Sequence, residues 1–240
     1  MEKTLQTLRY LLKSISTGIV IGLIVSLGTV AASDLLFYFT AKYYPLYSKT
    51  PLTTVPLTVP FEFTTGIVAL LIGLVLFIPD FKVALANGIS RKTFLLANLL
   101  SAGTAAAAFS IFNLLVVAIH GIFWPITFSS DLLYPKIGWG FLLIWQFALY
   151  LLIILAGRLI ALAYYRSSAL GRWVLSIAPW ALLGVWVVAN ARSEGALRAV
   201  LSEYLQWSLW FTRGSPMLLV YSAILCGVAY LLIRRAPLKD

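Results

Sequence analysis

The chain has 240 residues, of which 61% are hydrophobic and only 11% are charged, and its mean hydropathy is +0.95. This composition lies far outside that of water-soluble domains, so lipid must solvate most of the chain. The net charge of +10 would suit nucleic acid binding. In a lipid-embedded chain, however, basic residues more often fix topology and contact anionic head groups, so we expect membrane lipids and no nucleic acid as partners.

The apolar segments predict an all-α, polytopic membrane protein with six transmembrane helices in a single domain, residues 1–240. A span needs about 20 mostly apolar residues, and these runs do not alternate as the strands of a membrane barrel would. Charged or proline-rich breaks separate six such stretches, at residues 16–39, 61–78, 90–123, 139–164, 173–190 and 216–233.

Residues 1–15, which precede the first span, have an apolar side at helical spacing. Leu5, Leu8, Leu12 and Ile15 share that side, while basic and polar residues lie largely on the other. The pattern predicts an amphipathic interfacial helix that lies on the membrane surface.

Residues 191–215, before the last span, carry an apolar stripe together with a Glu194–Arg198 pair at i,i+4 spacing. Two structures suit this pattern equally: a re-entrant helical hairpin, or helices resting on the outer membrane surface. Gly214 and Pro216 predict a break before the last span.

The basic residues set the expected orientation. With the N-terminus in the cytoplasm, twelve of the 18 Lys and Arg residues fall on or near the inner side, as the positive-inside rule requires. We therefore expect a multi-pass protein of the cell membrane with both termini in the cytoplasm.

The inner segment 79–92 (PDFKVALANGISRK) is the most informative stretch of the chain. Asp80 is expected to cap a short helix over 81–86, Asn87 and Gly88 to close it, and Ser90 to cap the third span. From the residues alone, an ordinary basic loop is the favoured interpretation.

The run Ala86-Asn87-Gly88-Ile89-Ser90-Arg91-Lys92-Thr93-Phe94 resembles the coupling region between the second and third spans of ABC-2 permeases, a family of ATP-binding-cassette transporters. That family also has an N-terminal interfacial helix, six spans, two short re-entrant helices before the last span and often a basic C-terminal tail. This chain has candidates for all four features. The resemblance implies an ATPase-coupling interface made of Phe81, Lys82, Leu85, Asn87, Gly88, Ser90, Arg91 and Lys92.

The resemblance further implies the permease subunit of an exporter for a peptide, antibiotic or lipid-like substrate. Two separate cassette ATPase subunits would bind ATP and magnesium, and a second permease subunit, identical or different, would complete the transporter. The chain itself is expected to bind no cofactor and to catalyse nothing. With one His and one Cys it can assemble no His-Cys metal cluster or usual Ser-His arrangement, and it has no GxxxxGK[ST] phosphate loop.

Four polar residues of the spans form a candidate substrate path: Asp34, Glu62, Asn113 and Arg158. For each of them a plainer role is favoured. Arg158 is expected to extend to lipid phosphates, and Asp34 and Glu62 to be solvated or paired with Lys42. Asn113, like Asn98 and Gln146, is expected to form interhelical hydrogen bonds.

Two other classes stay open. One is the six-span substrate-binding component of a vitamin or small-molecule importer, which also lacks an ATPase. The other is a membrane-embedded enzyme that uses carboxylates or serine-lysine chemistry. The lack of paired polar residues at the depth of the bilayer centre disfavours the enzyme.

Overall fold

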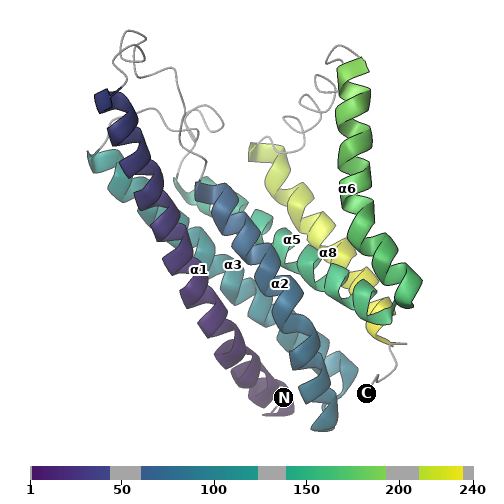
Figure 1. Ribbon diagram of the computed structural model, residues 1–240. Helices are drawn as coiled ribbons and strands as arrows, with labels where there is room; N and C mark the ends of the chain where they lie inside the picture. The colour runs from purple at the N-terminus through teal and green to yellow at the C-terminus, as the bar shows by residue number, and fades with distance from the viewer. Residues whose placement is uncertain (1, 44–60, 124–138, 193–210, 235–240) are drawn as a thin grey trace.

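The computed structural model of the chain describes residues 2–43, 61–123, 139–192 and 211–234. All elements in these ranges are helices (Figure 1): α1 (Glu2–Tyr43), α2 (Phe61–Ala86), α3 (Arg91–Phe123), α5 (Trp139–Arg166), α6 (Ala169–Arg192) and α8 (Phe211–Arg234). The predicted all-α class is confirmed for the described part of the chain.

Within the described ranges, five helices are long and apolar enough to cross a membrane, which indicates a multi-pass membrane protein. Their apolar stretches are Gln6–Thr29, Thr64–Ala86, Arg91–Val116, Trp139–Arg166 and Pro216–Arg234. The expected fifth span, 173–190, is helical as part of α6, but the apolar stretch described there is the shorter Ala169–Ala178.

Helix α1 differs from the expectation of two separate helices at the N-terminus. It runs without interruption from Glu2 to Tyr43. Ser14, next to the expected boundary at residue 15, donates a hydrogen bond to Asp80 of α2, and the neighbouring Leu11 and Ile15 are buried in the bundle. These tertiary contacts hold the boundary region in the helix. Location of residues 1–15 at the membrane surface stays a prediction.

Proline did not end helices where the sequence predicted breaks. Pro79 lies inside α2, and Pro216 lies inside α8, which begins at Phe211 and passes through Gly214. A proline removes one backbone hydrogen bond, and packing of neighbouring helices offsets that loss within a membrane bundle. Of the segment 191–215, residues 193–210 lie outside the described part, so the choice between a re-entrant and a surface helix stays open.

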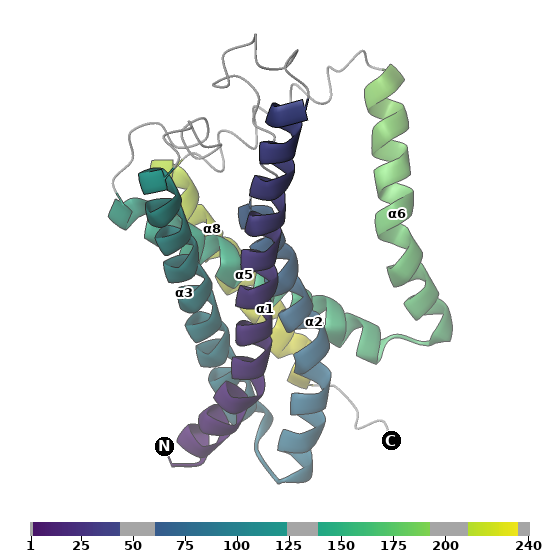
Figure 2. The ribbon, with the colours of Figure 1, turned by 60° about the vertical axis from the view of Figure 1, so that its left-hand side comes forward.

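The α2–α3 turn, the start of α1 and the end of α8 all lie at one end of the bundle (Figures 1 and 2), here called the turn end. A core cluster at this end joins α1, α2, α3, α5 and α8; its larger members are Leu11, Phe77, Phe81, Phe94, Tyr165 and Ile233. The Phe81 ring lies 5.3 Å from that of Phe94 between centroids. Five helices are therefore fixed to one another around the base of the turn.

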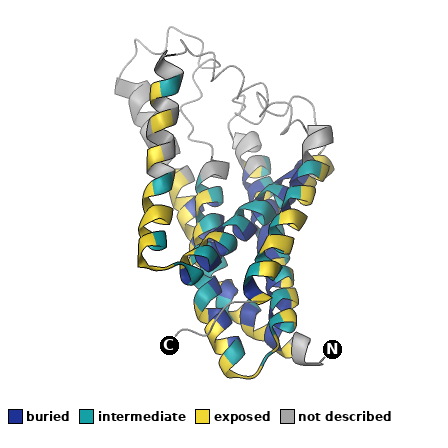
Figure 3. Ribbon diagram, turned by 90° about the vertical axis from the view of Figure 1, so that its right-hand side faces the viewer, coloured by how far each residue is buried: buried dark blue, intermediate teal, exposed yellow. Residues whose placement is uncertain are grey.

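Helix α6 is set apart from this bundle in both views (Figures 1 and 2). It follows α5 through a turn in which the Ser168 hydroxyl accepts a hydrogen bond from the Gly171 amide, capping the new helix. Apolar residues such as Leu170, Trp173 and Val185 are exposed on α6. Figure 3 shows the exposed positions along this helix in yellow. Lipid or another protein must cover them in a membrane.

Candidate functional site

The turn between α2 and α3 has the helix-ending geometry that the sequence predicted. Gly88 adopts a left-handed conformation with φ of 69°, which glycine tolerates without steric cost. The amide of Ile89 donates to the Ala84 carbonyl and that of Gly88 to the Leu85 carbonyl, each over 3.0 Å. This pair of bonds is the Schellman arrangement, which satisfies the last carbonyls of a helix.

The start of α3 is capped as predicted. The Ser90 hydroxyl accepts a hydrogen bond of 3.1 Å from the Thr93 amide, and its side chain also bonds the Thr93 hydroxyl at 2.8 Å. The Asn87 amide side chain donates to the Val83 carbonyl over 2.8 Å. The turn is therefore a rigid connection between two long helices.

Asp80 has a different role from the one predicted. Because α2 continues through Pro79 to Ala86, no separate short helix exists for Asp80 to cap. Its carboxylate is only 7% exposed and accepts a hydrogen bond of 3.0 Å from the Ser14 hydroxyl. Asp80 thus joins α2 to α1 just inside the turn.

The eight residues expected to couple to an ATPase differ in accessibility. Phe81 is fully buried in the turn-end core and is not part of any exposed surface. Leu85 and Arg91 are half-buried. The exposed members are Lys82, Asn87, Gly88, Ser90 and Lys92. A partner at this end would meet two lysines and an exposed backbone turn.

A surface pocket of about 310 Å³ lies beside the turn. The first turns of α1 contribute Gln6, Thr7 and Tyr10 to it, and the end of α2 and the turn contribute residues from Val83 to Ile89. The N-terminal helix and the α2–α3 turn therefore present one continuous surface.

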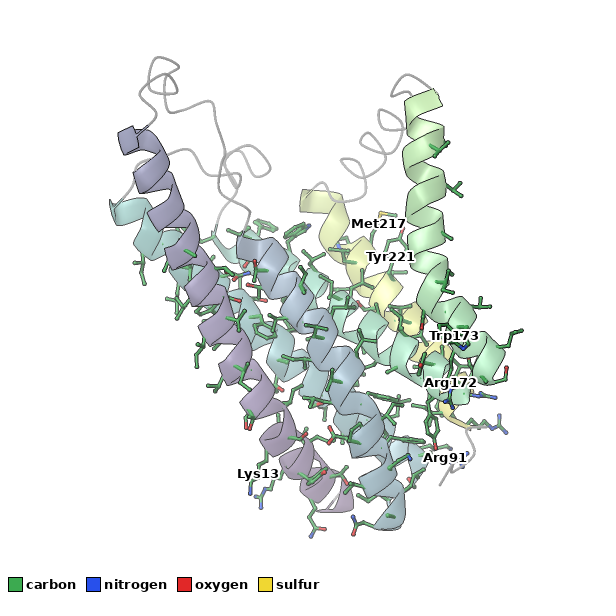
Figure 4. The ribbon with its side chains drawn as sticks, viewed as in Figure 1. Lys13, Arg91, Arg172, Trp173, Met217 and Tyr221 are labelled. Atoms are coloured by element: carbon green, nitrogen blue, oxygen red, sulfur yellow. The ribbon has the colours of Figure 1, made fainter. Side chains whose placement is uncertain are left out.

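Two arginines fix the end of α8 at the same end of the bundle. Arg91, at the start of α3, donates to the Arg234 carbonyl over 2.6 Å and to the Ile233 carbonyl over 3.3 Å. Arg166, at the end of α5, donates to the Leu232 carbonyl over 2.8 Å. Figure 4 shows Arg91 beside the last turn of α8. Positive charge at a helix C-terminus also interacts favourably with the helix dipole.

Replacing Arg91 by glutamine is expected to lower the free energy of unfolding by about 1 kcal/mol, because α8 loses charged hydrogen bonds at its negative end. Arg166→Gln should behave alike, and Lys92→Gln, at an exposed neighbouring position, is the control. Unfolding in mixed detergent micelles, followed by tryptophan fluorescence, measures the difference. An equal effect of Lys92→Gln would contradict this role of Arg91.

Arg158 is directed into the bundle rather than to the lipid phosphates. It is 6% exposed, and its guanidinium donates to the Asn98 carbonyl and, over 3.2 Å, to the Ser101 hydroxyl, both on α3. It also interacts electrostatically with Asp80. The expected extension to the membrane surface is therefore wrong: acceptors within the bundle satisfy the charge at lower cost than a longer reach to water.

Asn113 lies in a second polar cluster, remote from Arg158. The Thr65 hydroxyl donates to the Asn113 side-chain oxygen over 3.2 Å, and Asn113 donates to the Tyr150 hydroxyl. Ser26 of α1 bonds Thr65 at 3.2 Å, so four helices meet there. The predicted interhelical bonding of Asn113 is confirmed. Thr65 and Ser26 were not predicted, since hydroxyl residues are common in membrane helices and gave no distinguishing signal.

Of the four candidate path residues, Asn113 and Arg158 are not brought together. Asn98, which bonds Arg158, precedes Asn113 on α3 by fifteen residues, or about 22 Å at 1.5 Å per residue. Asp34 and Glu62 lie on α1 and α2, but their side chains are outside the described set. Asn113 and Arg158 act as links between helices and do not line a common passage.

Among the described residues, no group of three or more His, Cys, Asp or Glu side chains is placed to hold a metal ion. No known family model matches the chain, and no curated protein or solved structure is detectably similar to it.

Proposed function

We propose that the chain is the membrane subunit of an ABC-2-like exporter and that cassette ATPases dock at the turn end. The substrate class is a peptide, an antibiotic or a lipid-like molecule. One observation carries the proposal: the α2–α3 turn is capped on both sides, exposes Lys82, Ser90 and Lys92, and continues directly into two long helices.

Force applied to this turn has defined paths into the bundle. Phe81 and Phe94, on either side of the turn, pack against each other and against the core of five helices. Arg91 transmits the same displacement to the end of α8 through the Ile233 and Arg234 carbonyls. ATP-driven movement of a docked partner would thus shift α2, α3 and α8 together, which switching between two states requires.

A second permease subunit has a candidate contact surface. Helix α6 lies apart from the bundle and exposes Trp173, Ile177 and Val188, while the outer face of α1 exposes Ile21 and Ile24. A path between two subunits would not require the polar residues of one subunit to converge, which agrees with the separation of Asn113 and Arg158.

Reversing the charges of Lys82 and Lys92 is expected to abolish assembly with the ATPase and its stimulated hydrolysis of ATP, while membrane insertion is retained. Both lysines are exposed at the turn end, so their replacement by glutamate changes the docking surface. The Lys82 ammonium also lies 5.9 Å from the centroid of the Tyr165 ring, so Lys82→Gln, which removes that contact without reversing the charge, separates the two effects. The chain would be co-expressed with cassette ATPases, purified as a complex and assayed for ATP hydrolysis.

Lys13→Glu is the matched control, because Lys13 is exposed on α1, on the side of the bundle away from Arg91 (Figure 4). It should leave the assembly intact. If the ATPase still associates with the variant in which Lys82 and Lys92 are both glutamate, its docking site lies elsewhere than at the α2–α3 turn. Association with no ATPase at all would reject the permease function and favour the binding component of an importer or an enzyme.

A further inference from the structure

An apolar groove of about 520 Å³ runs along the outside of the bundle between α3, α5 and α8. Its walls include Leu95 and Leu99 of α3, Leu155 of α5, and the stretch of α8 from Leu219 to Tyr230. Eleven residue steps on α8 make the groove about 16 Å long at 1.5 Å per residue. That length is about half the hydrocarbon thickness of a bilayer, or one leaflet.

The groove ends at positive charge. Arg91 lies one helical turn before Leu95, and its bonds to the Ile233 and Arg234 carbonyls bridge α3 and α8 at the end of the groove. Arg234 lies one turn after Tyr230 and is exposed. On the α3 and α8 walls, the apolar lining is thus followed one helical turn further on by an arginine.

The interior offers no alternative place for a charged head group. The adjoining cavity that reaches Arg158 and Asn98 has a volume of about 10 Å³. It holds no more than about one water molecule, and Arg158 already donates to Asn98 and Ser101. An anionic ligand in the groove is therefore expected to place its charge at the Arg91 and Arg234 end, where described basic residues follow the groove walls on α3 and α8.

We propose that this groove is a binding site for an anionic phospholipid, with an acyl chain between α3 and α8 and the phosphate against Arg91 and Arg234. The groove volume falls in the range of about 300–1,000 Å³ that is typical of small-ligand sites. The length of the groove and the arginines at its end favour a lipid over a second copy of the chain. An anionic lipid requires both an apolar channel and a cationic group, whereas a helix of a second copy requires only the apolar channel.

The test uses the full chain, purified in detergent and freed of lipid. Native mass spectrometry then measures binding of phosphatidylglycerol and of phosphatidylcholine with the same acyl chains. Phosphatidylglycerol should bind about fivefold more tightly for each arginine that contacts the phosphate. Arg234→Gln should lower the affinity for phosphatidylglycerol about fivefold and leave the affinity for phosphatidylcholine unchanged. Lys13→Gln should change neither affinity.

A second variant tests the acyl-chain part of the site. A side chain added at Gly227 meets nothing within 4 Å of its Cβ, so Gly227→Phe fills the groove without a clash at Cβ and should weaken both lipids at least about tenfold. Gly28→Phe, added in similarly open space on α1, which does not line the groove, is the control. If Gly227→Phe lowers the unfolding temperature, Ala223→Phe, at an exposed lining position, replaces it.

Equal affinity for the two lipids, or affinities that neither groove variant changes, would show that the groove contacts lipid without selecting it and would overturn the proposal. Equally tight binding of glycerophosphate, which has no acyl chain, would overturn it as well. A dimer that Gly227→Phe dissociates without any change in lipid binding would assign the groove to a second copy. None of these results depends on an ATPase, so the proposed transport function is tested separately.

Discussion

Replacing Gly73 or Gly157 by leucine is expected to prevent stable folding of the bundle. These two glycines lie where α2 and α5 cross backbone to backbone. A Cβ built on Gly157 would stand 2.5 Å from the Leu70 carbonyl oxygen and 3.2 Å from the Gly73 Cα. A Cβ on Gly73 would clash in the same way with the Ile154 carbonyl oxygen.

The expected loss exceeds that of ordinary overpacking, which costs about 1–3 kcal/mol. Here the obstructing atoms belong to the main chain, which has no alternative rotamer, so the two helices must separate along their length. Small residues allow membrane helices to approach closely, and that approach supplies much of their association energy. Even Gly157→Ala should therefore measurably lower the unfolding temperature.

Two glycine positions nearby provide controls. A Cβ on Gly66 of α2 would make an ordinary contact of 3.6 Å with Ile153, and one on Gly103 of α3 would meet nothing within 4 Å. Gly66→Ala and Gly103→Ala should therefore leave the unfolding temperature in detergent almost unchanged. Similar unfolding temperatures for Gly73→Leu and Gly66→Ala would show that α2 and α5 are not in backbone contact.

The sequence predicted local features of the fold well, since their signals lie within a few residues. The end of α2 follows from Asn87 and Gly88, because a positive φ suits glycine. The start of α3 follows from Ser90, whose hydroxyl meets the Thr93 amide. Length and hydropathy likewise located the apolar stretches of α2, α3, α5 and α8, since lipid requires continuous helices of about 20 residues. The apolar stretch of α1 begins at Gln6, ten residues before the predicted span.

Features that depend on distant contacts were not predicted. The continuity of α1 through Ser14 was not predicted, because the partner of Ser14, Asp80, lies 66 residues away in the sequence. Asp80 was assigned as a cap for the same reason. The backbone crossing at Gly73 and Gly157 had no sequence signal at all, because glycines are common in membrane helices and only the packed structure distinguishes a close crossing from open space.

Arg158 shows how these distant contacts combine. It follows Gly157 directly, so the close approach of α5 to α2 fixes the position from which its side chain extends to Asn98 and Ser101 of α3. Asp80 of α2 is itself bonded to Ser14 of α1. Arg158 and Asp80, through their bonds to α3 and α1, therefore link four helices between the turn end and the centre of the bundle.

Replacing Arg158 by methionine is expected to lower the free energy of unfolding by about 3 kcal/mol, because the buried guanidinium loses its charged hydrogen bonds to Asn98 and Ser101 of α3. Methionine retains much of the side-chain volume, so the loss reports charge and hydrogen bonding rather than a cavity. The Ser101 hydroxyl retains its bond to the Asn98 carbonyl at 2.8 Å, so the main effect is the loss of the two hydrogen bonds that the guanidinium donates, and the loss of a positive charge near Asp80 adds to it.

A double-mutant cycle with Asp80→Asn separates these contributions. In the Arg158→Met background, Asp80→Asn removes the uncompensated carboxylate and should recover part of the lost stability, whereas in the wild-type background it should destabilise. Ser14→Ala, which removes only the hydroxyl that bonds Asp80, serves as the control and should not rescue Arg158→Met. Unfolding in mixed micelles gives the four free energies. Strict additivity of Arg158→Met and Asp80→Asn would show that the two charges do not act as a pair, and Arg158 would then stabilise the bundle through its hydrogen bonds to α3 alone.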